Sequence, residues 1–331
     1  FSSDPTLDSS YEGQVWFNST SGTLKTVVAS AAWASASPMT NTVAYSAGGG
    51  TQNAAFAASG YTPSGTNGTT ITEEYNGSGW GTGGTMSNAR YQAASAGSQT
   101  AGLVFGGYAG SAPGMTNTEE YDGSSWTAGG ALNQTGYAAG GLGTQTAGLY
   151  ASRFSGPSAT ASNVTEEYNG SSWTAISPGT QNTLSLDVGT AGTQTAGLQF
   201  GGQVPAGTTV NATTESYDGS TWTALNAMNS ARSQLGGSGI QTAAIAFAGR
   251  FTPPGSVLRA LTEQYDGTSW TETADLATAR RQVGSTRVET GNSQALAFGG
   301  QAPSVTAATE EFNLSINTVT AGAWASGGAM G

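Results

Sequence analysis

The chain has 331 residues, of which 51 are glycine, and it contains neither cysteine nor histidine. Thiol nucleophiles, disulfides, Cys/His zinc sites and histidine general bases are therefore excluded. Twenty acidic residues against nine basic ones give a net charge of −11, and an acidic chain without a basic run is a poor candidate for binding nucleic acid or an anionic membrane surface.

The first predicted elements are two strands joined by a tight turn. Residues 13–18 and 23–28 carry a hairpin pattern around the Ser-, Thr- and Gly-containing turn at 19–22. The run Glu-Gly-Gln-Val-Trp-Phe-Asn-Ser-Thr-Ser-Gly-Thr-Leu-Lys at 12–25 resembles a segment common in bacteriophage tail-fibre and other virion surface proteins. A plain β-hairpin without that ancestry is the alternative. Residues 1–32 are predicted to form an N-terminal extension that attaches the chain to its assembly.

A tryptophan repeat organises the rest of the chain. Five tryptophans follow one another at steps of 46, 47, 49 and 48 residues, and a tyrosine stands five residues before each. A fixed period in the forties, filled with short β-type segments, predicts a propeller in which each repeat is one four-stranded blade. The pairs are Tyr75 and Trp80, Tyr121 and Trp126, Tyr168 and Trp173, Tyr217 and Trp222, and Tyr265 and Trp270.

The second repeat shows the elements of one blade most clearly. Small residues at 93–96 form its first strand, and residues 99–107 give a buried strand that ends in Gly-Gly. Thr-Glu-Glu-Tyr at 118–121 and the strand of Trp126 flank Asp122-Gly123, a pair that favours a tight hairpin because both residues tolerate positive φ. Small residues fit the crowded axis of a propeller, and Tyr and Trp fill the space where blades diverge.

These motifs together resemble the kelch repeat, with Gly-Gly after the second strand, Tyr-Asp before a turn, Trp, and Met-x-x-x-Arg. The resemblance covers about residues 33–326 and implies a six-bladed, all-β propeller with four antiparallel strands per blade. Two repeats depart from Gly-Gly, with Ala58-Ser59 in the first and Ala151-Ser152 in the third. The arginine position is occupied by Val43, Gly136 and Thr183 in three repeats.

Closure of the ring has more than one solution. Trp33 and Trp324 both lie in segments that look like the outer strand of a blade, and a ring of six blades needs only one of them. A seventh blade built from both ends is the alternative, because Tyr11 and Trp16 repeat the Tyr-to-Trp spacing. We favour six blades, with the propeller over residues 33–331.

Arg90, Arg232 and Arg280 stand ten residues after a repeat tryptophan. At equivalent places on inner strands they would point towards one central opening, where guanidiniums could bind a carboxylate or sulfate. An arginine that hydrogen-bonds the backbone between blades is the simpler interpretation of this position.

The paired glutamates, such as Glu73-Glu74, Glu119-Glu120, Glu166-Glu167 and Glu310-Glu311, resemble general acid/base pairs only superficially. Adjacent strand residues face opposite sides, so the two carboxylates of one pair cannot share a substrate. Recurrence in every blade also favours a structural role.

The loops between the second and third strands vary most between repeats, at 61–68, 108–115, 154–162, 203–210, 250–259 and 301–305. They should cluster on one face, and variable loops on a rigid ring are typical of binding modules. The candidate binding residues on these loops are Tyr61, Tyr108, Phe154, Arg250, Phe251 and Arg259.

We expect a non-enzymatic structural or binding protein of a bacteriophage virion, a tail fibre or surface component in a virion or extracellular setting. Residues 1–32 would contact other subunits, and the loops would contact a host glycan or surface protein. A secreted bacterial kelch-type adhesin is the alternative. A glycan-cleaving enzyme would need a carboxylate outside the repeat, such as Asp187 or Asp275. We expect no cofactor, no metal site and no membrane span, because no apolar stretch approaches the roughly 20 residues that a span needs.

Overall fold

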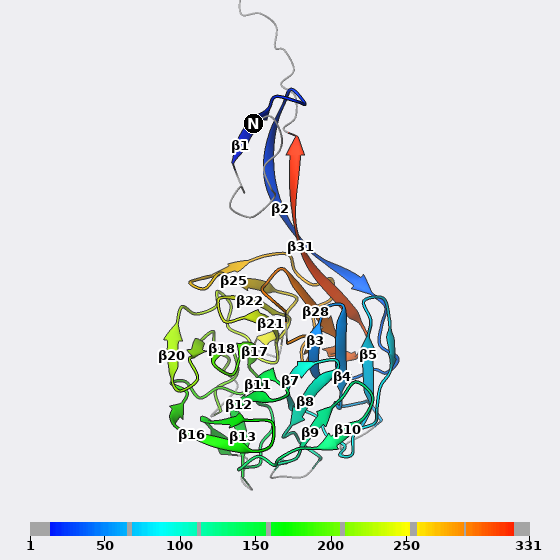
Figure 1. Cartoon of the computed structure of the whole chain (residues 1–331), viewed down its shortest axis with the longest axis vertical. Helices are drawn as coiled ribbons and strands as arrows, with labels where there is room; N and C mark the ends of the chain where they lie inside the picture. The colour runs from blue at the N-terminus through cyan, green and yellow to red at the C-terminus, as the bar shows by residue number, and fades with distance from the viewer. Residues whose placement is uncertain are drawn as a thin grey trace, which may run out of the picture. The chain divides into compact units, whose positions relative to one another are not determined.

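The protein is an all-β propeller of six blades (Figure 1), and the predicted fold class is confirmed. The computed structural model describes residues 14–64, 68–110, 114–156, 160–205, 209–251, 257–287 and 289–320. These residues include no helix long and apolar enough to cross a membrane.

The chain divides into two compact units. Trp33–Phe312 forms the propeller, and Phe1–Ala32 together with Asn313–Gly331 forms the second unit. The sequence assigned everything after residue 32 to the propeller, whereas the compact propeller unit ends at Phe312.

Each of the first five blades is a four-stranded antiparallel sheet whose strands follow one another in chain order. The first blade contains β3 (Ala47–Thr51), β4 (Ala54–Ala58), β5 (Thr72–Tyr75) and β6 (Trp80–Thr82), and the second contains β7 (Ala94–Ser98), β8 (Ala101–Phe105), β9 (Thr118–Tyr121) and β10 (Trp126–Ala128). The third contains β11 (Gly140–Thr144), β12 (Ala147–Ala151), β15 (Val164–Tyr168) and β16 (Trp173–Thr180). The fourth and fifth contain β17 (Gly189–Thr193), β18 (Ala196–Phe200), β19 (Thr214–Tyr217), β20 (Trp222–Leu225), β21 (Gly236–Ile240), β22 (Ala243–Phe247), β25 (Thr262–Tyr265) and β26 (Trp270–Glu272).

The sixth blade is completed by the N-terminal part of the chain. Its sheet contains β27 (Gly284–Ser285), β28 (Gln294–Phe298) and β31 (Thr309–Thr320), and its outer strand is β2 (Thr23–Ala36), which carries Trp33. The N-terminal segment therefore closes the ring, and no seventh blade is present among the described residues. The alternative ways of closing the ring relied on Tyr11 and Trp324, and both residues lie outside the described residues.

Three loops between second and third strands contain short hairpins of their own: β13 (Arg153–Ser155) with β14 (Thr160–Ser162), β23 (Arg250–Phe251) with β24 (Val257–Leu258), and β29 (Gln301–Ala302) with β30 (Ser304–Val305).

Glycine at the axis allows the inner strands to pack backbone against backbone. A Cβ on Gly141 would lie 2.7 Å from the amide nitrogen of Ser95 in the preceding blade, and one on Gly237 would lie 2.7 Å from the carbonyl oxygen of Thr190. Real Cβ atoms do not approach backbone this closely, so only glycine fits. The prediction that small residues occupy the axis is confirmed.

The Gly-Gly motif marks two left-handed residues at the end of the second strand. Gly106 and Gly107 have φ of 64° and 107°. In the first blade the equivalent residues are Ser59 and Gly60, with φ of 59° and 120°. The sequence alignment placed this pair one residue too early, at Ala58-Ser59, because it matched small side chains rather than the backbone conformation that glycine permits.

The repeat tryptophans join neighbouring blades by one recurring hydrogen bond. Each indole Nε1 donates to the Oγ1 of a threonine on the third strand of the preceding blade, at 2.8–3.0 Å. The six pairs are Trp33–Thr262, Trp80–Thr309, Trp126–Thr72, Trp173–Thr118, Trp222–Thr165 and Trp270–Thr214. Trp33 thus makes at the closure the same bond that holds every other pair of blades.

The paired glutamates serve the same scaffold. The first of each pair accepts backbone N–H groups from the loop that enters its blade, as Glu119 does from Ser87 at 2.7 Å. The second accepts the phenol of the next blade, as Glu74 does from Tyr121 at 2.6 Å, and burial together with this carboxylate raises the pKa of Tyr121 to about 12. The structural interpretation of these pairs is confirmed.

The described part of the second unit contains the predicted N-terminal hairpin. Strand β1 (Val15–Asn18) pairs antiparallel with β2, with Phe17 opposite Leu24. The side chain of Asn18 accepts the amide N–H groups of Thr20 and Ser21 and so closes the turn. Phe17 remains 54% exposed.

Because β2 closes the ring, we expect Trp33→Ala to lower the free energy of unfolding strongly. This substitution removes a blade-joining indole that contacts Phe247 and Phe312, and losing a packed tryptophan typically lowers the free energy of unfolding by about 3–5 kcal/mol. Guanidinium unfolding of the full chain measures the effect, with Phe17→Ala as the control that changes the propeller by less than about 0.5 kcal/mol. Equal stabilities of the two variants would show that β2 does not close the ring.

Candidate functional site

Six residues with left-handed backbone form a closed ring around the propeller axis. One comes from each blade, just before the first strand, and their φ values lie between 54° and 61°. The amide N–H of each donates to the carbonyl oxygen of the equivalent residue in the preceding blade, at 2.8–3.3 Å, until the circle is complete. We call these residues the axial ring: Tyr45, Gln92, Ala138, Asp187, Gln234 and Gln282.

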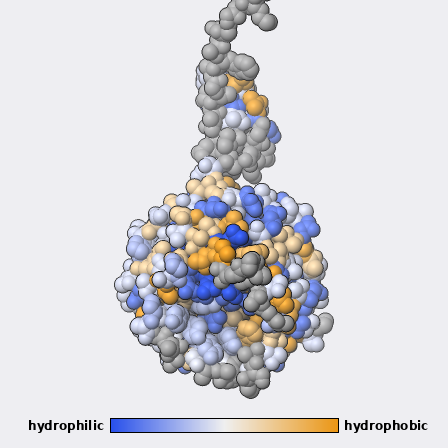
Figure 2. Space-filling model, turned by 180° about the vertical axis from the view of Figure 1, so that it is seen from behind, coloured by the Kyte–Doolittle hydropathy of each residue, from blue (hydrophilic) through white to orange (hydrophobic). Residues whose placement is uncertain are grey.

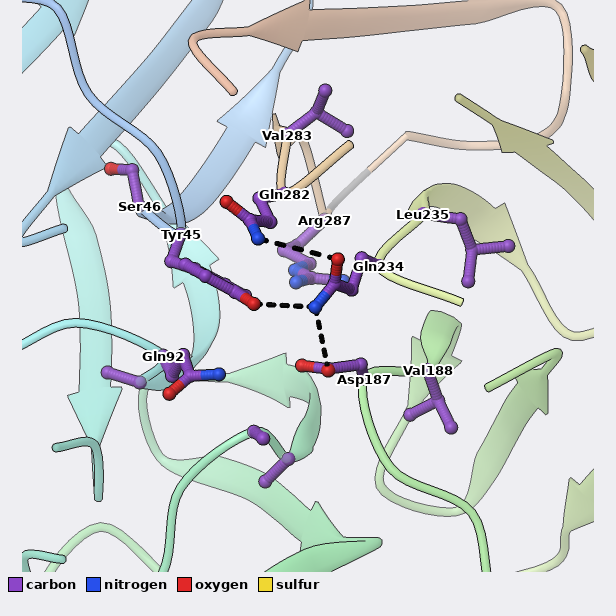
Figure 3. Close-up of a pocket in the computed structure, with 13 residues that line it drawn as sticks. Tyr45, Ser46, Gln92, Asp187, Val188, Gln234, Leu235, Gln282, Val283 and Arg287 are labelled. Atoms are coloured by element: carbon purple, nitrogen blue, oxygen red, sulfur yellow. Dashed lines mark hydrogen bonds between the residues drawn. The ribbon is translucent and has the colours of Figure 1, made fainter. Parts of the chain in front are cut away.

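The side chains of the axial ring line a cavity with room for a small group, about 70 Å³ (Figure 3). Gln234 lies at its centre, where Nε2 donates to the phenol oxygen of Tyr45 at 2.5 Å and to Oδ2 of Asp187 at 3.2 Å. Gln282 donates to Oε1 of Gln234 at 3.4 Å. Arg287, which follows β27, also projects into this space. We call it the axial cavity.

Asp187 is the one acidic side chain among the residues that line the axial cavity. Burial raises its pKa to about 6, against the weaker opposing effects of the Gln234 hydrogen bond and of the positive charges of Arg250 and Arg281. The carboxyl therefore changes its charge just below neutral pH. Asp275, the other carboxylate that the sequence offered for catalysis, lies elsewhere and accepts the amide N–H of Thr262 at 3.0 Å.

An unbroken series of aromatic rings covers one side of the cavity mouth. Tyr91 and Tyr137 each directly precede an axial-ring residue, and each forms a β-bridge with the first residue of a variable loop, Tyr108 and Phe154 respectively. The aromatic arc runs Tyr61, Tyr91, Tyr108, Tyr137, Phe154, with successive ring centroids 5.9, 5.4, 5.0 and 5.3 Å apart. All five side chains are half-buried, which leaves part of each ring open to a ligand.

The other side of the mouth is polar. Arg281 directly precedes Gln282 of the axial ring and donates to Oε1 of Gln301 at 2.8 Å. Arg250 bridges Ser233 through its backbone, and its guanidinium donates to Gln203. On the propeller face seen in Figure 2, strongly hydrophilic residues gather near the middle, with apolar residues beside them.

The structure brings together four of the six loop residues proposed from the sequence. Tyr61, Tyr108 and Phe154 belong to the aromatic arc, and Arg250 lies on the polar side. Phe251 and Arg259 instead contact each other, with the guanidinium carbon 5.4 Å from the ring centroid. The tips of five of these loops lie outside the described residues.

The sequence missed three aromatic residues of the site. Tyr45 belongs to the axial ring, and Tyr91 and Tyr137 stand one residue before it, where the other repeats have Ala44, Leu186, Ser233 and Arg281. Their signal was available, because Tyr91 and Tyr137 occupy the same place in two successive repeats.

The expectation that three arginines converge on the central opening is corrected. Arg90, Arg232 and Arg280 are fully buried, and they form ion pairs with Glu119, Glu263 and Glu310 on the third strands of their blades. Arg90 also donates to the carbonyl oxygens of Gly106 and Asn117 at 3.0 and 2.9 Å. Their guanidiniums lie in the blade walls because the glutamates that offset their buried positive charge are there.

In the third blade a fourth arginine forms the buried ion pair with the glutamate, but it stands at a different position of the repeat from Arg90. Arg153 is fully buried and pairs with Glu166 at 2.7 Å. It occupies the position of Gly107, and Gly136 occupies that of Arg90. A Cβ on Gly136 would lie 2.4 Å from the hydroxyl of Tyr150 and 2.5 Å from Cδ of Arg153, so the glycine makes room for both side chains. The sequence reading paired this repeat one residue early, at Ala151-Ser152, and missed the exchange.

The site offers stacking surfaces, amide and guanidinium donors and one carboxylate. Among the described residues, no group of three or more Asp and Glu side chains is placed to hold a metal ion. The arrangement therefore suits recognition of a polar ligand with flat apolar faces.

Comparisons with known proteins support the fold. The chain is similar to the solved structure of YjhT, with a TM-score of 0.67 and 11% sequence identity, covering 85% of this chain and 99% of that one. No family model matches the chain, and no curated protein matches it by sequence comparison. At this identity the likeness shows the propeller architecture alone.

The exchange of Arg153 and Gly136 predicts a rescue. Arg153→Gly leaves the carboxylate of Glu166 buried without its cation, which should lower the free energy of unfolding by about 3–5 kcal/mol. In a Tyr150→Val background, which supplies the residue that the second blade has at this place (Val104) and removes the hydroxyl beside position 136, adding Gly136→Arg restores the arrangement of the second blade and should recover more than half of that loss. Guanidinium unfolding of this background, both single variants and the double variant measures the coupling. A double variant no more stable than Arg153→Gly would contradict the exchange.

We expect the replacement of Asp187 by asparagine to raise the free energy of unfolding in a pH-dependent way. Because its folded-state pKa of about 6 exceeds the ordinary 3.8, the folded protein binds the proton more tightly, and stability falls as pH rises through this window. Asp187→Asn should therefore raise the free energy of unfolding by up to about 3 kcal/mol at pH 7.5 and by almost nothing at pH 4. The control is Asp275→Asn, which should not stabilise at pH 7.5. A gain at pH 4 that disappears at pH 7.5 would reverse the sign and refute this account.

Proposed function

We propose that this chain is a non-enzymatic, kelch-type binding module that recognises a glycan at the aromatic arc. The observation that carries the proposal is the series of five half-buried aromatic rings beside a polar cavity. A propeller fold suits a binding or structural role, because its loops vary without disturbing the ring.

The chemistry of the mouth favours a saccharide over a purely apolar ligand. A sugar ring presents C–H groups on its flat faces and hydroxyls around its edge, so it can stack on tyrosine and hydrogen-bond to amides and guanidiniums at once. The aromatic arc supplies the first surface, and Arg250, Arg281, Gln203 and Gln301 supply the second. Backbone hydrogen bonds of 2.7–3.2 Å fix the chain segments that carry these residues, which supports a site that is formed before the ligand arrives.

Binding is favoured over hydrolysis because the axial cavity is lined by one carboxylate. Hydrolysis of a glycosidic bond ordinarily uses two carboxyl groups, one as acid and one as base or nucleophile. A glycan-cleaving enzyme remains the second candidate, and the observation that favours it is Asp187, a carboxylate outside the repeat with a raised pKa.

The proposed setting is a bacteriophage virion, as a tail fibre or surface component outside the cell. Its support is the run at 12–25, which resembles virion surface proteins, and the hairpin β1–β2 that this run forms. Residues 1–32 would attach the chain to other subunits of the assembly, and the propeller would contact a host glycan. A secreted bacterial adhesin with the same propeller is the alternative setting.

A glycan array with the full chain tests the proposed function. Tyr91→Ala and Tyr108→Ala each remove a central ring of the aromatic arc and should weaken binding of the best glycan by at least about tenfold, because a lost stacking contact is worth ~1 kcal/mol or more. Phe17→Ala in the hairpin β1–β2 is the matched control and should bind as the wild type does.

Two results would overturn the proposed function. One is the absence of any glycan bound by the wild type. The other is turnover of the bound glycan that Asp187→Asn abolishes, which would establish the enzyme instead.

A further inference from the structure

Arg287 differs from the four arginines of the blade walls because no carboxylate pairs with it. Arg90, Arg153, Arg232 and Arg280 each have a glutamate partner. Arg287 has no acidic partner among the described residues, and burial lowers its pKa to about 10 with no carboxylate acting in the other direction. Its nearest acid along the described chain, Glu289, accepts the amide N–H of Gln52 instead.

The guanidinium of Arg287 is held in a fixed place inside the axial cavity. Its backbone N–H donates to the carbonyl oxygen of Gly50 at 3.0 Å. Its Nη1 donates to Oγ1 of Thr190 at 2.7 Å, and that hydroxyl in turn donates to the carbonyl oxygen of Gly141 at 2.7 Å. Its Nε has no hydrogen-bond partner in the described structure, which is equally true of Arg153, Arg232 and Arg280, so Arg287 differs from them in having no carboxylate among the described residues as its partner. A positive charge so placed is stabilised by an anion that enters from outside.

The charged side chains around the axial cavity carry a net positive charge, which favours the binding of an anion. Asp187 lies within the influence of two arginines, Arg250 and Arg281, which both lower its pKa. Tyr45 is neutral, because burial raises the pKa of its phenol well above the ordinary value. One carboxylate therefore faces three guanidiniums at the axis and mouth, in a protein whose overall charge is −11. The site is a local positive region on an acidic molecule.

The size of the cavity limits what can enter. About 70 Å³ is roughly half of the ~150 Å³ of a cavity that holds benzene, which is enough for a carboxylate but too little for a sugar ring. A ring bound at the aromatic arc would remain at the mouth, while a carboxylate attached to it extends inward.

We propose that the axial cavity binds the carboxylate of an acidic sugar, with Arg287 as the residue that pairs with it. This inference rests on the proposed glycan-binding function and specifies its ligand class. Carboxylate and guanidinium match in geometry as well as charge, and the interaction is strong where water is largely excluded. The sugar ring contacts the aromatic arc, and the acid group determines selectivity.

Isothermal titration of the full chain at pH 7.5 tests this assignment with four probes. These are D-glucuronate, its neutral methyl ester, D-glucose, and sodium acetate as the free anion. D-glucuronate is expected to bind at least tenfold more tightly than each of the other three. Acetate alone reports whether the anion needs the sugar ring.

Arg287→Gln removes the charge and should raise the Kd for glucuronate at least tenfold, to the level of the neutral methyl ester, while leaving the Kd for glucose unchanged. Arg287→Lys keeps a positive charge and should retain part of the preference for glucuronate. Arg259→Gln is the matched control, because Arg259 lies on Phe251 outside the axial cavity, and it should bind all four probes as the wild type does.

The outcomes separate this inference from the proposed function. Equal affinity for glucuronate and glucose in the wild type would overturn the carboxylate site and leave the glycan-binding proposal standing. An unchanged glucuronate Kd in Arg287→Gln would do the same. Acetate bound as tightly as glucuronate, with no neutral sugar bound, would overturn both and identify a site for free anions.

Discussion

The closed ring of six backbone hydrogen bonds is the constraint on which the rest of the propeller depends. It sets the spacing of the blades at the axis, and the bond from Tyr45 of the first blade to Gln282 of the sixth completes it. Each member must adopt left-handed φ, which costs a non-glycine residue roughly 1 kcal/mol. One hydrogen bond gained per residue contributes about the same amount, so the ring is neutral in energy and strict in geometry.

Because this ring uses only backbone atoms, its side chains carry no part of the closure. They are accordingly unlike one another: three glutamines, a tyrosine, an alanine and an aspartate. Further from the axis, neighbouring blades are joined by Trp–Thr and Tyr–Glu hydrogen bonds. Because these bonds use side chains, the same residue types recur from blade to blade. Residues that recur in every blade therefore belong to the scaffold. At the axis one side chain from each blade meets the other five, so differences between the blades can form a single asymmetric site there.

Periodicity predicted the blades, the Trp and Tyr positions and the role of the glutamate pairs, because these depend on local sequence and recur. It could not predict which terminus closes the ring, since Trp33 and Trp324 are equivalent as sequence and only pairing in space distinguishes them. Arg90, Arg232 and Arg280 were assigned to the axis because spacing gives a position along a strand but not the direction of a long side chain. The sequence did not single out Arg287 for a related reason. The residues next to it along the chain do not show whether a carboxylate will lie beside its guanidinium in the folded protein.

The arginines show how the same side chain acquires two roles in one protein. In a blade wall the guanidinium of Arg90 meets Glu119 and two carbonyl oxygens, so its charge and donors are used within the fold. At the axis the guanidinium of Arg287 donates to the hydroxyl of Thr190, and no carboxylate of the described residues offsets its charge. Arg90 is fully buried, whereas Arg287 is half-buried at the cavity. The distinction lies in whether a carboxylate is within reach, and that is a property of the assembled ring rather than of any repeat.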